Sequence, residues 1–147
     1  AAQHHFPTRE ALVTATLEQI FADLTAVTSK SAEPAGDRIA AVVDRAVDLY
    51  TGKEFKAALQ VWAAAASDPA LRELILPLEA KFARAAHRMT VQALGASDDE
   101  QRIHRVAQLT LDLARGLGLA DTLSDDSKRR AQVVATYVDM VRSALGE

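Results

Sequence analysis

The sequence contains no cysteine, which excludes disulfide bonds and thiolate metal sites. A chain without cysteine fits a cytoplasmic protein, because disulfides belong mainly to oxidising compartments. No apolar run approaches the roughly 20 residues that a transmembrane helix requires, so we expect no membrane partner. Aromatic residues make up only 5% of the chain, and the abundance of alanine favours helices over sheets.

Positive charge is not concentrated anywhere along the chain. The formal net charge of the 147 residues is −3. Residues 31–95 carry eight basic against eight acidic side chains, and residues 96–147 carry seven against nine. Proteins that bind nucleic acids rely on a basic patch that neutralises phosphates, and this chain by itself has no such patch.

The apolar residues recur with the 3.6-residue period of amphipathic helices, and no strand pattern or repeat is present. Together with the punctuation between the periodic segments, this predicts an all-α single domain of about six helices. The predicted helices cover residues 8–28, 35–50, 54–66, 69–94, 100–115 and 125–145.

Short capping sequences mark the predicted helix starts. The sequences "TGKE" (51–54) and "SDDE" (97–100) have the spacing of capping boxes, and in the first of these Thr51 and Glu54 would accept from each other's free amides. Asp68 is a predicted N-cap, and Pro69 occupies the first helical position, where its missing N–H costs nothing.

Residues that disturb helices mark the interior of one predicted helix and the end of another. Pro77 should kink the fourth helix, because proline removes a backbone donor. Gly116 and Gly118 should break the chain between the last two helices, because glycine is unfavourable inside a helix.

The last two predicted helices each carry two apolar stripes rather than one. A helix on the surface of a monomer needs a single stripe, so the second stripe predicts a homodimer in which two helices from each chain form a four-helix bundle. The alternative is that both helices lie at the centre of a monomer. The residues predicted at the dimer interface are Leu109, Leu113, Val134, Tyr137, Val138 and Val141.

The first residues, "AAQHHFPTREAL" (1–12), resemble the end of the DNA-binding domain in tetracycline-repressor-type (TetR family) transcriptional regulators. In that family a recognition helix ends in an aromatic–x–His–Phe stretch, and a Pro-Ser/Thr-Lys/Arg-Glu-x-Leu turn opens a long helix. In this sequence, residues 5–10 and Leu12 match the family pattern, while Gln3 replaces the commoner tyrosine. Residues 62–74, "WAAAASDPALREL", and residues 111–123, "LDLARGLGLADTL", resemble later parts of the family's layout more loosely.

The resemblance implies that residues 1–7 are the tail of a DNA-recognition helix and its turn. Residues 8–147 would then form the effector-binding and dimerisation domain of a repressor, with most of the helix-turn-helix missing. Operator DNA would be a partner only when the full helix-turn-helix is present. Among the residues here, Arg9 at a helix start is a candidate phosphate contact, and His4 and His5 are further candidates when protonated.

Aromatic and apolar side chains of the middle helices are candidates for a ligand pocket. Helix bundles hold small apolar ligands between such faces, with a few polar groups that fix orientation. The alternative is that the cluster is plain core. The TetR resemblance favours a pocket for a small-molecule effector of unknown identity. The candidates are Tyr50, Phe55, Leu59, Trp62, Phe82 and Met89, with His87 and Thr110 as polar groups.

Catalytic and metal-binding patterns are not found. The sequence has no metalloprotease, nucleophile-elbow or glycine-rich phosphate motif. Glu100 and His104 are four residues apart, but no second pair completes a di-metal bundle site. We therefore expect no metal, no cofactor and no enzyme. One weak candidate for a catalytic cluster of ionisable groups is His87 with Glu79 or Arg84.

Two other classes of protein remain compatible with these patterns. One is a helical carrier of small ligands, or a partner-binding domain, with no link to DNA. The other is an enzyme built on a helical bundle, which would require a cluster of ionisable groups in the pocket.

Overall fold

The computed structural model describes residues 8–29 and 37–147, and these residues form α-helices and no strand. The prediction of an all-α fold of six helices is confirmed for the described residues. Within the described ranges, no helix combines the length and the apolar character needed to cross a bilayer. The helices are α1 (Arg9–Ser29), α2 (Arg38–Thr51), α3 (Lys53–Ala66), α4 (Pro69–Leu94), α5 (Glu100–Ala120) and α6 (Ser127–Leu145).

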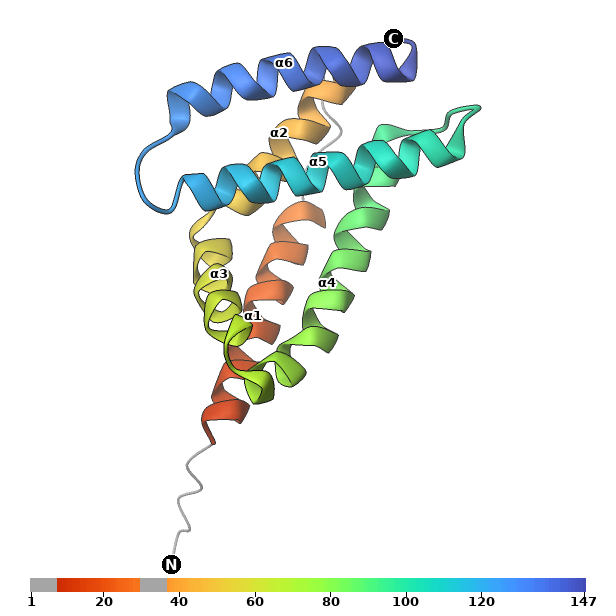
Figure 1. Cartoon of the computed structure of the whole chain (residues 1–147). Coiled ribbons are helices and arrows are strands. Elements are labelled where there is room, and N and C mark those ends of the chain that lie inside the picture. Colours follow the sequence, from red (N-terminus) through yellow and green to blue (C-terminus); the bar gives the residue numbers. More distant parts are fainter. Residues whose placement is uncertain (1–7, 30–36) are drawn as a thin grey trace, which may run out of the picture.

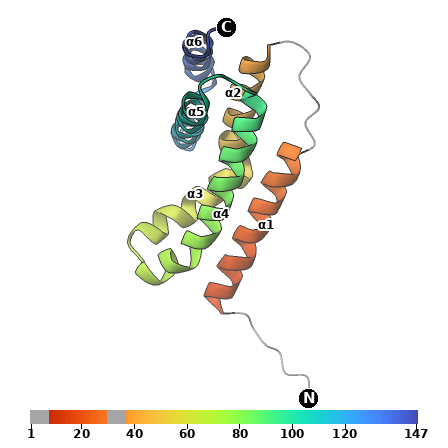
Figure 2. The ribbon, with the colours of Figure 1, turned by 90° about the vertical axis from the view of Figure 1, so that its right-hand side faces the viewer.

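The helices are arranged so that α1 and the α5–α6 pair lie on opposite sides of the molecule. Figure 1 shows α5 and α6 running side by side across one end of the fold, and α1 beginning at the other end. Figure 2, turned by 90°, shows α4 between α1 and α5. α2 packs most closely against α5 and also contacts α4 and α6. The core therefore lies around α2, with Leu17, Ile39, Phe55 and Leu94 among its fully buried side chains.

The helix starts at α4 and α5 are fixed by aspartates. Asp68 accepts a hydrogen bond from the amide of Leu71 at 3.1 Å, and Pro69 is the first helical residue, as the sequence predicts. In α5 the cap is Asp99, which accepts from the amide of Arg102 at 2.9 Å. The capping box predicted at 97–100 is therefore wrong, because the N-cap of α5 lies two residues after Ser97 and Glu100 is the first helical residue.

The capping box predicted at "TGKE" is wrong. Thr51 is the last residue of α2, and its hydroxyl donates to the carbonyl of Val47 at 2.8 Å. The N-cap of α3 is Gly52, which has no side chain to accept a hydrogen bond. Because a threonine hydroxyl can bond back to the preceding turn of a helix, Thr51 extends α2 instead of opening α3.

The predicted break at Gly116 and Gly118 is also wrong, because α5 continues through both glycines to Ala120. Gly118 allows α5 to approach α2 closely: a Cβ atom there would lie 2.1 Å from the carbonyl oxygen of Tyr50. A Cβ atom at Gly116 would have nothing within 4 Å. Pro77 lies inside α4 and does not end that helix.

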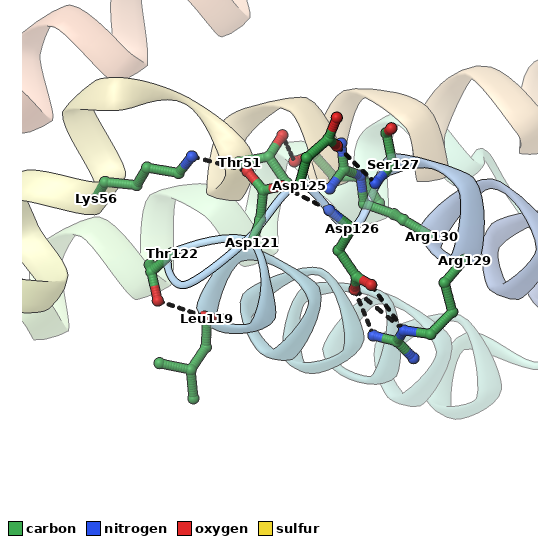
Figure 3. A network of polar contacts seen from close by, with 11 residues as sticks. Thr51, Lys56, Leu119, Asp121, Thr122, Asp125, Asp126, Ser127, Arg129 and Arg130 are labelled. Atoms are coloured by element: carbon green, nitrogen blue, oxygen red, sulfur yellow. Dashed lines mark hydrogen bonds and ion pairs between the residues drawn. The ribbon is translucent and has the colours of Figure 1, made fainter.

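A polar network holds the turn between α5 and α6 against α3 (Figure 3). The carboxylate of Asp121 accepts from Lys56 Nζ at 2.7 Å and from Arg130 Nη1 at 2.9 Å. These two partners, Lys56 foremost, lower the pKa of Asp121 to about 2. At the far end of α6, ion pairs of Arg38 with Glu147 and of Asp37 with Arg142 join it to the start of α2.

Candidate ligand-binding site

A groove of about 380 Å³ lies between α3, α4 and α5 and opens to solvent. Its volume falls within the range of roughly 300–1,000 Å³ that is usual for small-molecule sites. Most of its walls are apolar, and three charged side chains face it from two helices. The lining residues are Trp62, Ala65, Ala66, Arg72, Ile75, Leu76, Glu79 and Arg115.

Trp62 is one of a series of aromatic rings that runs from the groove into the core. Its ring meets Phe55 edge to face at a centroid distance of 5.4 Å, and Phe55 meets Tyr50 in the same way at 4.4 Å. Edge-to-face packing of this kind adds to the stability gained from burial. Tyr50 and Phe55 are fully buried behind Trp62, and Leu59 is partly buried beside the core. Of these predicted pocket residues, only Trp62 lines the groove.

Arg115 of α5 lies over two of these rings. Its guanidinium carbon is 5.7 Å from the ring centre of Tyr50 and 5.8 Å from that of Trp62, which is within the range of cation–π attraction. Burial raises the pKa of Tyr50, and the positive charge of Arg115 partly opposes that shift. Arg115 Nη1 also lies 3.7 Å from Asp112 Oδ1 on the outer side of α5.

Two residues that line the groove each carry a buried hydrogen-bond donor with no acceptor among the described residues. Trp62 Nε1 and Arg115 Nε are both buried, and neither has a partner in the part of the chain that the structure describes. Buried polar groups in folded proteins are nearly always hydrogen-bonded. A pair of such donors beside one groove therefore indicates a place where a ligand's acceptor group would complete the bonding.

The sequence patterns did not reveal Arg115 as a site residue. The fifth helix was predicted to end at residue 115, and a basic side chain at a helix C-terminus is a common structural feature. In the structure α5 continues for five more residues to Ala120, and Arg115 lies inside it. Its position four residues after the buried Leu111 was the available signal, because such residues share one helix face.

A smaller cavity of about 40 Å³ lies between α2, α4 and α5. Phe82 and Met89, both predicted for the pocket, contribute to its walls together with the polar Arg45 and Thr90. The Thr90 hydroxyl donates to the carbonyl of Ala86 at 2.7 Å, so it is already bonded. A space of this size accommodates a water molecule but not a drug-sized ligand.

Phe82 also connects the cavity to α1. Its ring stacks on Phe21 of α1 with a centroid distance of 4.9 Å and an interplanar angle of 15°. Both side chains are buried. A movement of α4 at Phe82 would therefore displace the contact that α4 makes with α1 through Phe21.

The two predicted polar pocket residues lie outside both hollows. His87 Nε2 is 2.9 Å from Nδ1 of His104, and the two rings stack where α4 meets α5. The Thr110 hydroxyl donates to the carbonyl of Val106 at 2.7 Å and lies 2.8 Å from the Tyr137 hydroxyl. Thr110 thus joins α5 to α6 rather than facing a ligand. Within residues 8–29 and 37–147, no group of three or more potential metal ligands exists.

The residues predicted for a dimer interface separate into buried and exposed groups. Val138 and Val141 are only 5% and 3% exposed within the single chain, so they belong to its own core, not its surface. Leu113, Val134 and Tyr137 are half-buried. Leu109 is 59% exposed, and Met140 of α6, which the interface prediction did not include, is 63% exposed. Leu109 and Met140 are therefore exposed apolar side chains of α5 and α6, together with Leu119 of α5, which is also 59% exposed.

The predicted phosphate contacts cannot be placed. His4 and His5 lie outside the described residues, as does the side chain of Arg9.

Comparison with known proteins gives one informative similarity. The chain is 27% identical to the HTH-type transcriptional regulator CymR of Pseudomonas putida, and the alignment covers 97% of this chain and 72% of CymR. No protein-family model and no solved structure matches the chain. The extent of the alignment shows distant homology to a transcriptional regulator over nearly the whole chain.

Proposed function

We propose that this chain is the effector-binding and dimerisation core of a ligand-responsive transcriptional regulator of the TetR type. The alignment with CymR, an HTH-type transcriptional regulator, over 97% of the chain carries this proposal. The TetR-like sequence at residues 1–12 also supports it, with 1–7 as the tail of a recognition helix and 8–147 as the core. Its partners are a second copy of the chain, a small effector, and operator DNA when a complete helix-turn-helix is present.

The groove between α3, α4 and α5 is the proposed effector site. An effector there contacts α4, and α4 carries Phe82 against Phe21 of α1. Since the TetR resemblance puts the DNA-reading unit ahead of α1, a shift of α1 in each protomer changes the spacing of two reading helices. Half-sites lie about 34 Å apart on DNA, so a change of a few ångströms weakens operator binding and the chain acts as a repressor.

The proposed dimer forms through exposed apolar side chains of α5 and α6 that include Leu109 and Met140. α5 and α6 of two copies pack there as a four-helix bundle. In this proposed dimer the half-buried Leu113, Val134 and Tyr137 become further covered when the copies meet. Val138 and Val141 support α6 from inside the chain.

Sedimentation equilibrium at micromolar concentration tests the dimer. We expect the native chain to be dimeric and Leu109→Asp to be monomeric, because a buried unpaired carboxylate is strongly unfavourable. Leu12→Asp is the matched control, because Leu12 of α1 is 54% exposed and lies on the opposite side of the fold. A native chain that is monomeric, or a Leu109→Asp variant that remains dimeric, would contradict the proposal.

A further inference from the structure

We propose that the groove between α3, α4 and α5 binds a small amphipathic monoanion, whose carboxylate or similar oxyanion accepts hydrogen bonds from Trp62 Nε1 and Arg115 Nε. This inference rests on the proposed function, because it names the chemical class of the effector for that same groove. It goes further in specifying a charge, a hydrogen-bonding group and the two residues that recognise them.

The two unpaired donors specify an acceptor. The indole nitrogen of tryptophan and the guanidinium nitrogens of arginine donate hydrogen bonds and cannot accept them. Neither Trp62 Nε1 nor Arg115 Nε has a partner among the described residues, and both atoms are buried. Hydroxyl or carbonyl oxygens of a ligand would satisfy them, but an anionic oxygen forms the stronger bond to a guanidinium.

The charges around the groove specify a single negative charge. Arg72 and Arg115 contribute two positive charges to the lining, and Glu79 contributes one negative charge. Arg72 Nη2 donates to the carbonyl of Ala66 at 2.7 Å, which holds it at one end of the groove. The lining itself therefore has one positive charge in excess. Asp112, which lies 3.7 Å from Arg115 Nη1, is outside the lining and is 53% exposed, so that a monoanion balances the lining more closely than a dianion or a cation does.

The remaining walls specify an apolar body. Ile75 and Ala65 are buried, and Leu76 is 52% exposed. An apolar group placed against Leu76 and the Trp62 ring removes this surface from water, which stabilises the complex. The groove of about 380 Å³ accommodates a ligand of one or two rings or a short alkyl chain.

Arg115 is held in place by contacts within the chain itself. Its guanidinium lies over the rings of Tyr50 and Trp62, and Nη1 lies near Asp112. A guanidinium that is already oriented loses little conformational freedom on binding. This arrangement favours recognition by Arg115 Nε over a general attraction between charges.

A matched pair of dyes tests the inference on the intact chain. Anilinonaphthalenesulfonate is an apolar monoanion, and N-phenylnaphthylamine is the same skeleton without the sulfonate. Both become fluorescent in apolar sites, so that a titration gives the Kd of each. We expect the sulfonate to bind about tenfold more tightly, as one charge-assisted hydrogen bond provides.

Variants of the two donors locate the binding. Arg115→Gln should remove the preference for the sulfonate, Arg115→Lys should restore part of it, and Trp62→Phe should weaken the sulfonate but not the neutral dye. Arg105→Gln is the matched control, because Arg105 is an exposed arginine of the same helix. Circular dichroism checks folding, and if Arg115→Gln does not fold, Trp62→Phe alone decides the outcome.

The two proposals can fail separately. The inference would be overturned if the two dyes bound with equal affinity, or if Arg115→Gln and Trp62→Phe left the affinity for the sulfonate unchanged. The dye would then be bound elsewhere, for example near the exposed Leu109 and Met140. If the chain sediments as a monomer but prefers the sulfonate in a way that depends on Arg115, the result would support the inference and contradict the proposed regulatory function.

Discussion

Replacing Gly118 by alanine would put a methyl group where the backbone of α2 already lies. The new Cβ atom would be 2.1 Å from the Tyr50 carbonyl oxygen, 2.8 Å from its carbonyl carbon and 3.1 Å from its Cβ. The shortest of these separations falls about 1.3 Å below ordinary van der Waals contact. The obstacle is main chain inside a helix, so no side-chain rotation relieves it, and α5 must move away from α2.

The cost can be set against the gain in helix propensity. Alanine is more favourable than glycine in a helix by about 1 kcal/mol. Overpacking a close interface costs about 1–3 kcal/mol, and more where backbone must shift. Because the α2–α5 contact is central to the fold, we expect Gly118→Ala to lower the free energy of unfolding by about 2 kcal/mol or more.

The same helix provides the control. Gly116 is exposed, and a methyl group added there would have nothing within 4 Å, so Gly116→Ala should raise stability by about 0.5–1 kcal/mol. Urea unfolding followed by circular dichroism, at one protein concentration for all variants, gives both values. If Gly118→Ala were as stable as Gly116→Ala, the close approach of α5 to Tyr50 would be refuted.

Two further predictions concern the contacts of α5 with α3 and α6. The pKa of Asp121, lowered to about 2 by Lys56 and Arg130, means that its contribution to stability is complete above its ordinary pKa and is lost as pH falls from about 5 towards 2. This contribution to the free energy of unfolding is at most about 2 kcal/mol, and solvent around the partly exposed Lys56 reduces it to about 1 kcal/mol. Asp121→Asn should therefore flatten the fall in stability at acid pH. An unchanged fall in stability in this variant would refute the prediction. Tyr137→Phe removes the partner of the Thr110 hydroxyl but leaves Thr110 bonded to its own helix. Urea unfolding should therefore show that the free energy of unfolding falls by about 0.5–1.5 kcal/mol. An unchanged free energy of unfolding would refute the Tyr137–Thr110 bond.

Local signals in the sequence were sufficient for the number and type of the helices. Asp68 and Pro69 begin α4 where predicted, because an aspartate cap followed by proline acts within one turn of chain. The prediction for Thr51 was wrong for an equally local reason. A threonine can bond forward as a cap or backward to the preceding turn, and the pattern "TGKE" does not distinguish the two.

Contacts between helices were not predictable in this way. Gly118 looked like a break because glycine has a low helix propensity. Its role depends on Tyr50, which lies 68 positions earlier in the sequence and meets it only after α2 and α5 have packed. Arg115 was missed because its proposed role requires Trp62 of α3 and the groove beside α4.

The choice between the two apolar stripes of α6 illustrates the same limit. The sequence showed that two stripes exist, but not which one the chain would bury itself. The chain buries the side that carries Val138 and Val141, while the side with Met140 remains exposed. Because residues three or four apart on a helix share a face, moving the contact by one residue exchanges core for surface.

α5 is the element on which the proposed activities meet. One side of it approaches α2 at Gly118, a second carries Arg115 to the groove, and a third exposes Leu109. A rigid helix cannot change its position at one of these contacts without changing it at the others. If the chain binds a ligand in the groove and associates through Leu109 as proposed, we expect the two events to be coupled wherever α5 moves. Linkage then makes the coupling reciprocal: a ligand that strengthens the dimer by some factor is itself bound more tightly by the dimer by that factor.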